Sequence, residues 1–466
     1  MSSTLQARPV TTVLAVRPTI SLSPHPEGIT VTGVGWEQLV AVSSPGVRDA
    51  VLSVRESPMP SSEILRRALE ASGDLSAAVL VQSVVKRLSV LGVFEHVLFE
   101  PGNGAVARLM TAGAMPVGLS ALPPDARLRV LSPMAVATVR AGEVVVESGV
   151  SHLQVALRPD LFALVVAGDL DALPDPVLAM LCTARLLVTP EETASRRFRQ
   201  WDATDLWFHR KANESRGADG YGGTYHLADD FKPVPYARPV PPGGSLALPV
   251  PDLAQARAAD PPLAEVMERR RSHRRFLAGR TSQEQLGALL YRALRARQIH
   301  PDDRGLDVVD RPYPSGGSVH EIETYVVVND VTGIEAGIYR YAPDRHALDV
   351  LQQNDAIRAR VNADVMITTR GEQPPPVVLL FGARFDRLMW KYQGMPYALL
   401  TKHVGVVYQT IYVNAEAEGL GVCGIGGTSA SLFAQATGEH PMDEGAVGMM
   451  VLGVPDPSER DAWGRP

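Results

Sequence analysis

The stretch that decides the fold is LLTKHVGVVYQTIYVNAEAEGLGVCGIGG, residues 399–427. Its first part predicts one long helix that ends at Gly419. Four more glycines follow within eight residues, at positions 421, 424, 426 and 427. Such a composition brings backbone amides close to a cofactor, although a helix C-cap followed by a plain loop would use the same residues. The spacing of these glycines matches neither the dinucleotide-binding fingerprint nor the P-loop.

The segments around this stretch predict a domain of mixed helices and strands over residues 256–466. Two shorter helices are expected in PPLAEVMERRRSHRRF (261–276) and TSQEQLGALLYRALRARQ (281–298), and strands in IETYVVVND (322–330), GIYRYA (337–342), PVVLLFGA (376–383) and VGMMVLGVP (447–455). Helices and strands mixed in this way indicate an α+β layer structure.

An arginine-rich run, RRRSHRRF (269–276), follows the first of these helices. Arg270, Arg271, Ser272 and Arg274 could surround one phosphate, because guanidinium groups offer bidentate donors and the hydroxyl adds another. The alternative is a solvated helix end, where the helix dipole favours cations.

A second motif, RPYPSGGSVHEIETYVVV (311–328), places Pro, Ser and two glycines just before an apolar strand. A tight loop of this kind exposes backbone N–H groups and lets a flat ring approach closely, and an ordinary β-turn would use the same residues.

Lys391 and Tyr392 form a third feature, a lysine beside a phenol at the end of the apolar run LMW. The chain holds only five lysines against forty arginines, so a deprotonatable amine at this position is unusual. Cys423, by contrast, is expected to be a small buried side chain, because no histidine stands beside it to activate the thiol.

The N-terminal half predicts two similar modules, residues 1–105 and 106–217, each with strands flanking two helices. The second repeats the first after 114 residues, which superposes Leu39 on Leu153, Pro45 on Pro159 and Val51 on Val165. This element order suits a winged-helix module that binds a peptide or partner, and modules with a packing role only are an equal alternative. Residues 218–255 are rich in Pro and Gly and predict a linker or a strap lying on a neighbour.

Composition excludes several classes of protein. The formal net charge of the 466 residues is -6 and no basic block occurs, so nucleic acid is not an expected partner. No apolar run is long enough for a membrane span, and no signal peptide is evident. Two cysteines can supply neither a disulfide framework nor a zinc site, so no metal is expected. We expect a soluble cytoplasmic protein.

The order of the arginine run, the Pro-Ser loop and the Gly-Ile-Gly loop resembles the nitroreductase superfamily of FMN-dependent, usually domain-swapped homodimeric oxidoreductases. With WKYQGMPYALLTKHVGVVYQTIYVNAEAEGLGVCGIGG (390–427) and FAQATG (433–438), the chain is similar to the SagB-type branch, the thiazole/oxazole dehydrogenases of ribosomally made peptides. WDATDLWFHRKANESRG (201–217) and the strap also resemble long members from thiopeptide and cyanobactin-type pathways. The resemblance therefore implies a C-terminal nitroreductase-like FMN domain preceded by two winged-helix-like modules, an azoline-containing precursor peptide as substrate and a cyclodehydratase as partner.

The resemblance also implies roles for particular residues. The FMN phosphate and ribityl end would be held by Arg270, Arg271, Ser272 and Arg274. The isoalloxazine would be covered from the second subunit by Pro314, Ser315, Gly316 and Ser318. Its other edge would be lined by Gly424, Ile425 and Gly426, with an N–H near Gly426 at flavin N5. Lys391 and Tyr392 match the Lys-Tyr pair of the family. The chain departs from many relatives at Glu321, where they have proline after the histidine, and its C-terminal phosphate contacts are unassigned, with Arg460 and Arg465 as candidates.

Oxidising an azoline to an azole removes a proton and a hydride from adjacent ring carbons. A phenol is too weak a base unless its pKa is lowered, which a protonated Lys391 could do for Tyr392. A desolvated, neutral Lys391 could instead be the base, and we favour Tyr392. The alternatives to an azoline dehydrogenase are a nitroreductase or flavin reductase that uses a nicotinamide cofactor, and a non-catalytic docking subunit of a peptide-modifying complex.

Overall fold

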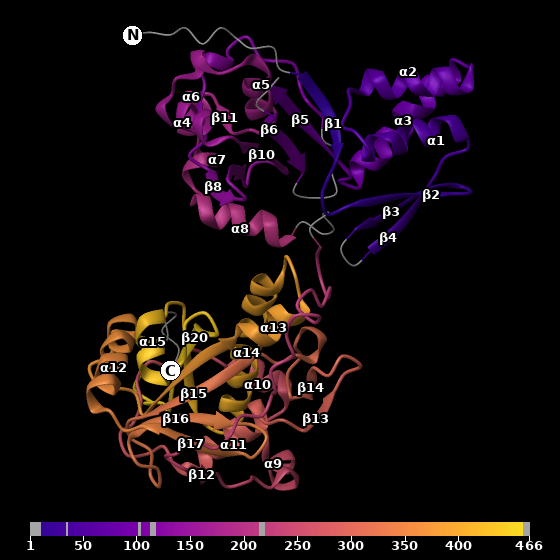
Figure 1. The fold of residues 1–466 in the computed structure, drawn as a ribbon. Coiled ribbons are helices and arrows are strands. Elements are labelled where there is room, and N and C mark those ends of the chain that lie inside the picture. The colour runs from indigo at the N-terminus through magenta and orange to yellow at the C-terminus, as the bar shows by residue number, and fades with distance from the viewer. Residues whose placement is uncertain (1–10, 34–35, 101–103, 112–117, 214–219, 460–466) are drawn as a thin grey trace. The chain divides into compact units, whose positions relative to one another are not determined.

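A computed structural model describes residues 11–33, 36–100, 104–111, 118–213 and 220–459 (Figure 1). The chain divides into two compact units, residues 1–224 with 393–395, and residues 225–392 with 396–466. Within the described residues, no helix has the length and apolar character needed to cross a membrane. The domain boundary expected at 217/218 and the candidates Arg460 and Arg465 lie outside the described residues.

The first unit contains three sheets and eight α-helices among its described residues. Its strands are β1 (Thr11–Val16), β2 (Ser21–His25), β3 (Gly28–Gly33), β4 (Trp36–Ala41), β5 (Phe94–Glu100), β6 (Gly104–Thr111), β7 (Val130–Leu131), β8 (Ala135–Arg140), β9 (Glu143–Ser148), β10 (Leu153–Leu157) and β11 (Leu187–Val188). Its helices are α1 (Pro45–Leu52), α2 (Ser61–Ser72), α3 (Ser76–Val90), α4 (Pro159–Ala167), α5 (Asp175–Thr183), α6 (Pro190–Ala194), α7 (Arg196–Arg199) and α8 (Ala203–Asn213).

The two expected N-terminal modules share one sheet. Each has its own apolar core, one under α1–α3 with the sheet β2-β3-β4 and one around α4 and α5. The six-stranded sheet, of order β1-β5-β6-β10-β9-β8, joins strands from both modules, and the expected boundary at 105/106 falls inside β6. Pro45 and Pro159, which the repeat superposes, each begin a helix, α1 and α4, where the fixed φ of proline suits the first turn.

The second unit is built on a seven-stranded antiparallel sheet of order β12-β17-β16-β15-β18-β20-β19. The described strands of this unit are β12 (Ser245–Ala247), β13 (Gln298–Pro301), β14 (Asp307–Asp310), β15 (Ile322–Val328), β16 (Gly337–Ala342), β17 (Ala347–Gln352), β18 (Val377–Arg384), β19 (Gly421–Ile425) and β20 (Glu444–Gly453). Of these, β13 and β14 form a separate two-stranded sheet. The described helices of this unit are α9 (Leu253–Ala259), α10 (Leu263–Arg269), α11 (Gln283–Leu294), α12 (Asp355–Thr369), α13 (Phe385–Lys391), α14 (Pro396–Ala417) and α15 (Ala430–Thr437).

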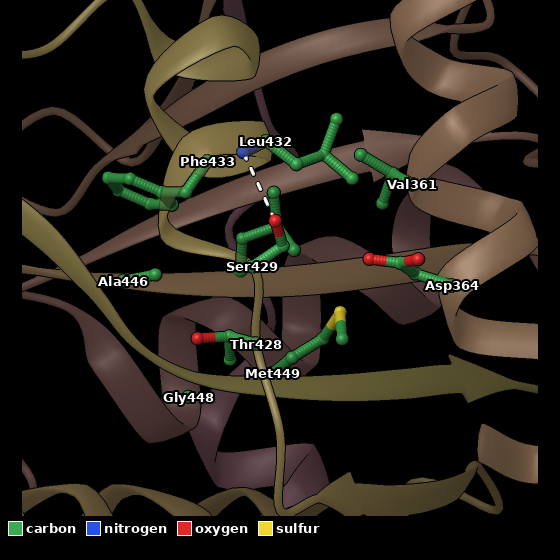
Figure 2. Close-up of a pocket in the computed structure, with 10 residues that line it drawn as sticks. Val361, Asp364, Thr428, Ser429, Leu432, Phe433, Ala446, Gly448 and Met449 are labelled. Carbon is green, nitrogen blue, oxygen red and sulfur yellow. Dashed lines mark hydrogen bonds between the residues drawn. The ribbon is translucent and has the colours of Figure 1, made fainter.

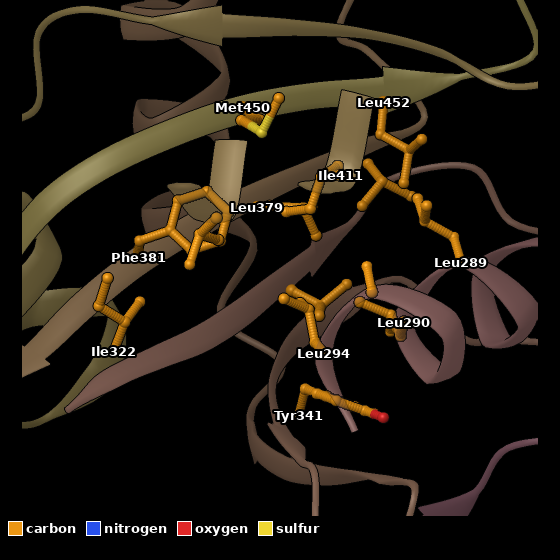
Figure 3. Close-up of a cluster of buried hydrophobic side chains, with 14 of the residues drawn as sticks. Leu289, Leu290, Leu294, Ile322, Tyr341, Leu379, Phe381, Ile411, Met450 and Leu452 are labelled. Atoms are coloured by element: carbon orange, nitrogen blue, oxygen red, sulfur yellow. The ribbon is translucent and has the colours of Figure 1, made fainter. Parts of the chain in front are cut away.

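Helices cover both faces of this sheet, which confirms the expected α+β layers. One core joins the sheet to α11 and α14, and Figure 3 shows Leu289, Leu290 and Leu294 of α11 with Phe381 of β18 and Leu452 of β20. The other core lies between the sheet and α12 and α15. Strand β15 is buried along its whole length, because alternate side chains enter the two cores.

The proline-rich segment after residue 225 is a strap that lies along the second unit itself, here defined as residues 227–251. Buried side chains hold it by its carbonyl groups: Trp390 Nε1 donates to Phe231 O at 2.8 Å, Arg387 to Val234 O at 2.7 Å and Arg340 to Pro239 O at 2.9 Å. A segment with so few N–H groups cannot form helix or much sheet, so donors must come from outside it.

Candidate functional site

The long helix α14 organises the candidate site, because it contacts the arginine run, the glycine loop and the Pro-Ser loop. Its tyrosines Tyr408 and Tyr412 face β19 and β20, and its His403, five residues before Tyr408 and nine before Tyr412, contacts the Pro-Ser loop. Residues nine apart in a helix are separated by about 14 Å along its axis, so the contacts of His403 and Tyr412 lie at two separate places on the helix.

Tyr412 joins the arginine run to the glycine loop. Helix α10 ends at Arg269, and the next residues run beside β19, where the His273 N–H donates to Val422 O at 2.9 Å. The hydroxyl groups of Ser272 and Tyr412 lie 2.8 Å apart, and the Gly424 N–H donates to the same phenol at 2.8 Å. The guanidinium of Arg270 lies 5.1 Å from the centre of the Tyr412 ring.

The remaining cations of the run differ in exposure. Arg270 and Arg271 are half-buried, whereas Arg274 is exposed and its backbone N–H donates to Glu459 at 3.1 Å. Burial and the charge of Arg271 lower the pKa of His273, which favours its neutral form. The cationic donors at this end are therefore the arginines, which suit an anion such as a phosphate.

The glycine loop is shaped by close packing on one side and open space on the other. A Cβ on Gly424 would lie 2.9 Å from the Tyr408 ring, so only glycine fits there, whereas a Cβ on Gly426 or Gly427 would meet nothing within 4 Å. The Ile425 side chain is buried in the core under α15, so only its backbone can face a ligand. Cys423 is buried and burial raises the pKa of its thiol, as expected for a packing residue.

A buried pair of side chains holds the Pro-Ser loop. The Gly316 N–H donates to Nε2 of His403 at 2.7 Å, and Nδ1 of His403 lies 2.7 Å from the Glu321 carboxylate. Ser315 donates to the other oxygen of Glu321 at 3.4 Å and accepts the His320 N–H at 3.1 Å. Because Nε2 accepts a hydrogen bond, the His403 proton lies on Nδ1 and points to Glu321.

Lys391 and Tyr392, at the end of α13, lie directly against this loop. The Lys391 ammonium donates to Gly317 O at 3.4 Å. A Cβ on Gly317 would lie 2.6 Å from the Tyr392 hydroxyl and 2.7 Å from Lys391 Nζ. The residue also has φ +59, so both the space and the backbone conformation favour glycine here. Burial raises the pKa of Tyr392; Lys391 acts in the opposite direction with a smaller effect, and Tyr225 and Glu321 raise the pKa further.

A cavity of about 490 Å³, within the range of ligand pockets, is lined in part by the Pro-Ser loop. Its wall comes from the β13–β14 hairpin and the loop itself, with residues His300, Val308, Val309, Asp310, Arg311, Pro312, Tyr313, Pro314, Ser315, Gly317, Ser318 and His320. Burial, with the charge of Arg311, lowers the pKa of His320 to about 3, so its imidazole is neutral. The buried Tyr313 hydroxyl and His320 Nδ1 have no hydrogen-bond partner within the described part of the chain.

A second cavity, shown in Figure 2, lies between α12, α15 and β20 and measures only about 20 Å³. Leu432, Phe433 and Met449 give it an apolar lining, and Ser429 is engaged in capping α15. A space of this size holds about one water molecule, so it is a packing defect rather than a ligand site.

Sequence reasoning missed the side chains that assemble the site. His403, Tyr408 and Tyr412 all lie on α14, and Glu321 was noted only as a departure from relatives. The four-residue spacing of Val404, Tyr408 and Tyr412 is a signal that could have placed both phenols on one helix face.

Comparisons with known proteins give one family match and several similar proteins. The Nitroreductase family matches residues 267–454. A protein of Methanocaldococcus jannaschii named as a nitroreductase is 28% identical over 189 residues, 40% of this chain and 85% of that protein. The trifolitoxin-processing protein TfxB of Rhizobium leguminosarum bv. trifolii is 32% identical over 110 residues, 23% of this chain and 30% of TfxB. The E. coli microcin synthetase McbBCD complex contains a chain with 19% identity and a TM-score of 0.34, covering 55% of this chain and 93% of that one.

Proposed function

We propose that this protein, which carries a nitroreductase-family domain at residues 267–454, is an FMN-dependent azoline dehydrogenase acting on a ribosomally made peptide. Proteins of this family include structures in complex with FMN. The observation that carries the proposal is the gathering of three sequence motifs along α14, the arginine run, the glycine loop and the Pro-Ser loop, with the Lys391–Tyr392 pair lying against the Pro-Ser loop.

The residues present fit FMN. Arg270, Arg271, Ser272 and Arg274 would hold its phosphate, since the first three are half-buried donors beside the open side of the glycine loop. Pro314, Ser315, Gly316 and Ser318 would cover the isoalloxazine from a second subunit, and the cavity of about 490 Å³ along this loop gives room for a flat ring. Gly424, Ile425 and Gly426 would face its other edge through their backbone.

When bound, FMN supplies a two-electron acceptor that dioxygen can reoxidise. The chain must then supply the group that takes the proton from the azoline ring. Lys391 and Tyr392 are the candidates, because their polar ends lie beside the Cα of Gly317, where the side chain of a larger residue would displace them. We assign the proton to this pair, with Tyr392 as the acceptor and Lys391 as the cation that opposes the effect of burial on the pKa of Tyr392.

A peptide substrate is supported by the similarity to TfxB, whose name describes toxin processing. The two N-terminal modules would then bind the precursor peptide or a cyclodehydratase partner, which raises the effective concentration of the azoline at the site.

The proposal is tested by incubating FMN-loaded protein with a synthetic thiazoline peptide in air. The expected product has lost two hydrogen atoms, as measured by mass spectrometry. A protein that is rapidly reduced by NADH or NADPH and leaves the thiazoline unchanged is instead a nitroreductase or flavin reductase, as the name of the Methanocaldococcus relative suggests. A folded protein that stays colourless with added FMN would contradict both functions and leave a docking role.

Flavin retention is a separate prediction. Arg270→Ala and Ser272→Ala each remove a donor beside Tyr412, so each variant should lose FMN more readily on gel filtration than the wild type. Arg257→Ala is a matched control, because Arg257 is exposed on α9 and lies outside the arginine run. Equal retention by all four proteins would contradict the phosphate assignment.

A further inference from the structure

Tyr225, just before the strap, lies beside the proposed proton acceptor. Its backbone N–H donates to Lys391 O at 3.0 Å, and its ring packs edge-on against Trp390, with ring centres 5.7 Å apart. The Lys391 ammonium lies 5.5 Å from the centre of the Tyr225 ring and 5.8 Å from that of Tyr392. An ammonium within about 6 Å of an aromatic face is held there by the ring quadrupole.

A second cation lies over the same ring. Arg304, in the turn between β13 and β14, has its guanidinium carbon 4.6 Å from the centre of the Tyr225 ring. Its backbone is fixed by a hydrogen bond from its N–H to Asp302 at 2.9 Å. The ring of Tyr225 thus links the hairpin that borders the cavity to the Lys391 side chain.

The backbone at Tyr225 provides an independent observation. Its φ is +53, a left-handed conformation that a residue with a bulky side chain rarely adopts. Such a conformation persists only where surrounding contacts fix it, and it is concentrated at functional sites. Glycine would be the relaxed choice here, and a tyrosine that accepts this strain brings an aromatic face to Lys391.

We infer that Tyr225 is a positioning residue of the site: its aromatic face holds the Lys391 ammonium against Gly317 O, between the rings of Tyr225 and Tyr392. The importance of this contact for turnover rests on the proposed function. The hydroxyl of Tyr225 is not needed for the contact, because the interaction comes from the ring.

The contact can be measured without any substrate or flavin. The chain has only five lysines, so reductive ¹³C-methylation gives a simple NMR spectrum of the full-length protein. Lys391 should give a methyl signal shifted upfield by the ring currents, identified by its loss in Lys391→Arg. Tyr225→Leu should move this signal toward those of exposed lysines, and Tyr225→Phe should leave it upfield.

A matched control comes from the other lysine that lies over an aromatic ring. Lys211 Nζ is 4.6 Å from the ring centre of Trp207, so its signal should also be upfield, and Trp207→Leu should shift it without moving that of Lys391. A Lys391 signal that is not upfield in the wild type, or is the same in Tyr225→Leu, overturns the inference.

Kinetics then test the effect on turnover. With the thiazoline peptide, Tyr225→Leu should lower kcat by about ten- to a hundredfold with little change in KM, and Tyr225→Phe should restore it. An unchanged kcat in Tyr225→Leu would overturn the positioning role. Absence of thiazoline turnover in the wild type would instead overturn the proposed function, while the NMR spectra still decide the contact.

Discussion

At the scale of single residues, the proposed chemistry rests on Lys391 and Tyr392, and the structure sets two effects on the pKa of Tyr392 against each other. Burial raises the pKa of the phenol and the neighbouring ammonium lowers it. As the proposed proton acceptor, Tyr392 therefore depends on the Lys391 ammonium staying in place, and the proposal treats the two residues as one functional unit.

Substitutions of this pair should separate its two roles. Tyr392→Phe keeps the ring, so FMN binding should survive while azoline oxidation falls by about a hundred- to ten-thousandfold. Lys391→Arg keeps the charge but cannot act as a base, so partial activity is expected if Tyr392 takes the proton. Lys402→Arg, on an exposed position of α14, is the control and should be active. Full activity of Tyr392→Phe together with an inactive Lys391→Arg would make the lysine the base.

Glu444 gives a residue-scale prediction about stability. It is 1% exposed, pairs with Arg238 of the strap and accepts the Tyr325 hydroxyl at 2.8 Å. Burial, partly offset by Arg238, raises its pKa from 4.5 to about 7. Because the folded value is above the unfolded one, this contribution to stability is fully present below about pH 4.5 and is lost as the pH rises through about 7.

The unfolding free energy of the wild type should therefore fall by on the order of 3 kcal/mol as the pH rises across this range from the Glu444 contribution alone. Denaturant titrations from about pH 5 to pH 8.5 measure it. Glu444→Gln should show a flatter dependence, whereas Glu439→Gln, which alters a more exposed partner of the same arginine, should keep the slope. Identical slopes for the wild type and Glu444→Gln would show that this carboxyl does not control the effect.

At the scale of elements, the buried Arg387 of α13 joins this helix to the strap and to two further segments. Arg387 is fully buried and donates to Val234 O in the strap, Asp307 O in β14 and Val319 O beside the Pro-Ser loop. Burial and the nearby Arg384 lower the pKa of Arg387 to about 10, so it remains charged at neutral pH.

Arg387→Met should leave three carbonyl groups without this donor and lower the stability by on the order of 3–5 kcal/mol. Limited proteolysis should then cut within residues 227–251 faster than in the wild type. Arg257→Met, at an exposed position of α9, is the matched control and should resist cleavage. Equal cleavage rates in all three proteins would show that Arg387 does not hold the strap.

At the scale of the whole molecule, we predict a homodimer in which each flavin site takes the arginine run from one chain and the Pro-Ser loop from the other. Within one chain, Tyr392 lies with the Pro-Ser loop and Arg270 lies with the glycine loop. The double variant Arg270→Ala/Ser272→Ala and the single variant Tyr392→Phe should therefore damage different halves of each site.

Mixing these two variants and exchanging their chains should restore activity, because one site of each heterodimer would be intact. The mass in solution and the turnover of the mixture are the measurements. Activity that stays at the level of the separate variants after proven chain exchange, or a monomer with full flavin content, would contradict the shared site.

The sequence alone determined the layers of the second unit, the long helix and the order of its motifs, because apolar patterning and turn residues act locally. It predicted a glycine-rich loop after that helix, but residues 421–425 form the edge strand β19, and only residues 426–429 connect this strand to α15.

Only the tertiary structure decided which motifs meet. Ser272 and Gly424 are 152 residues apart in sequence and both bond to the phenol of Tyr412, and Glu321, just before β15, pairs with His403 of α14. Local propensity cannot specify such contacts, since each depends on how helix and sheet pack. The strap illustrates the same limit: its proline content predicts an extended chain, but the buried arginines that bind its carbonyl groups lie more than a hundred residues later.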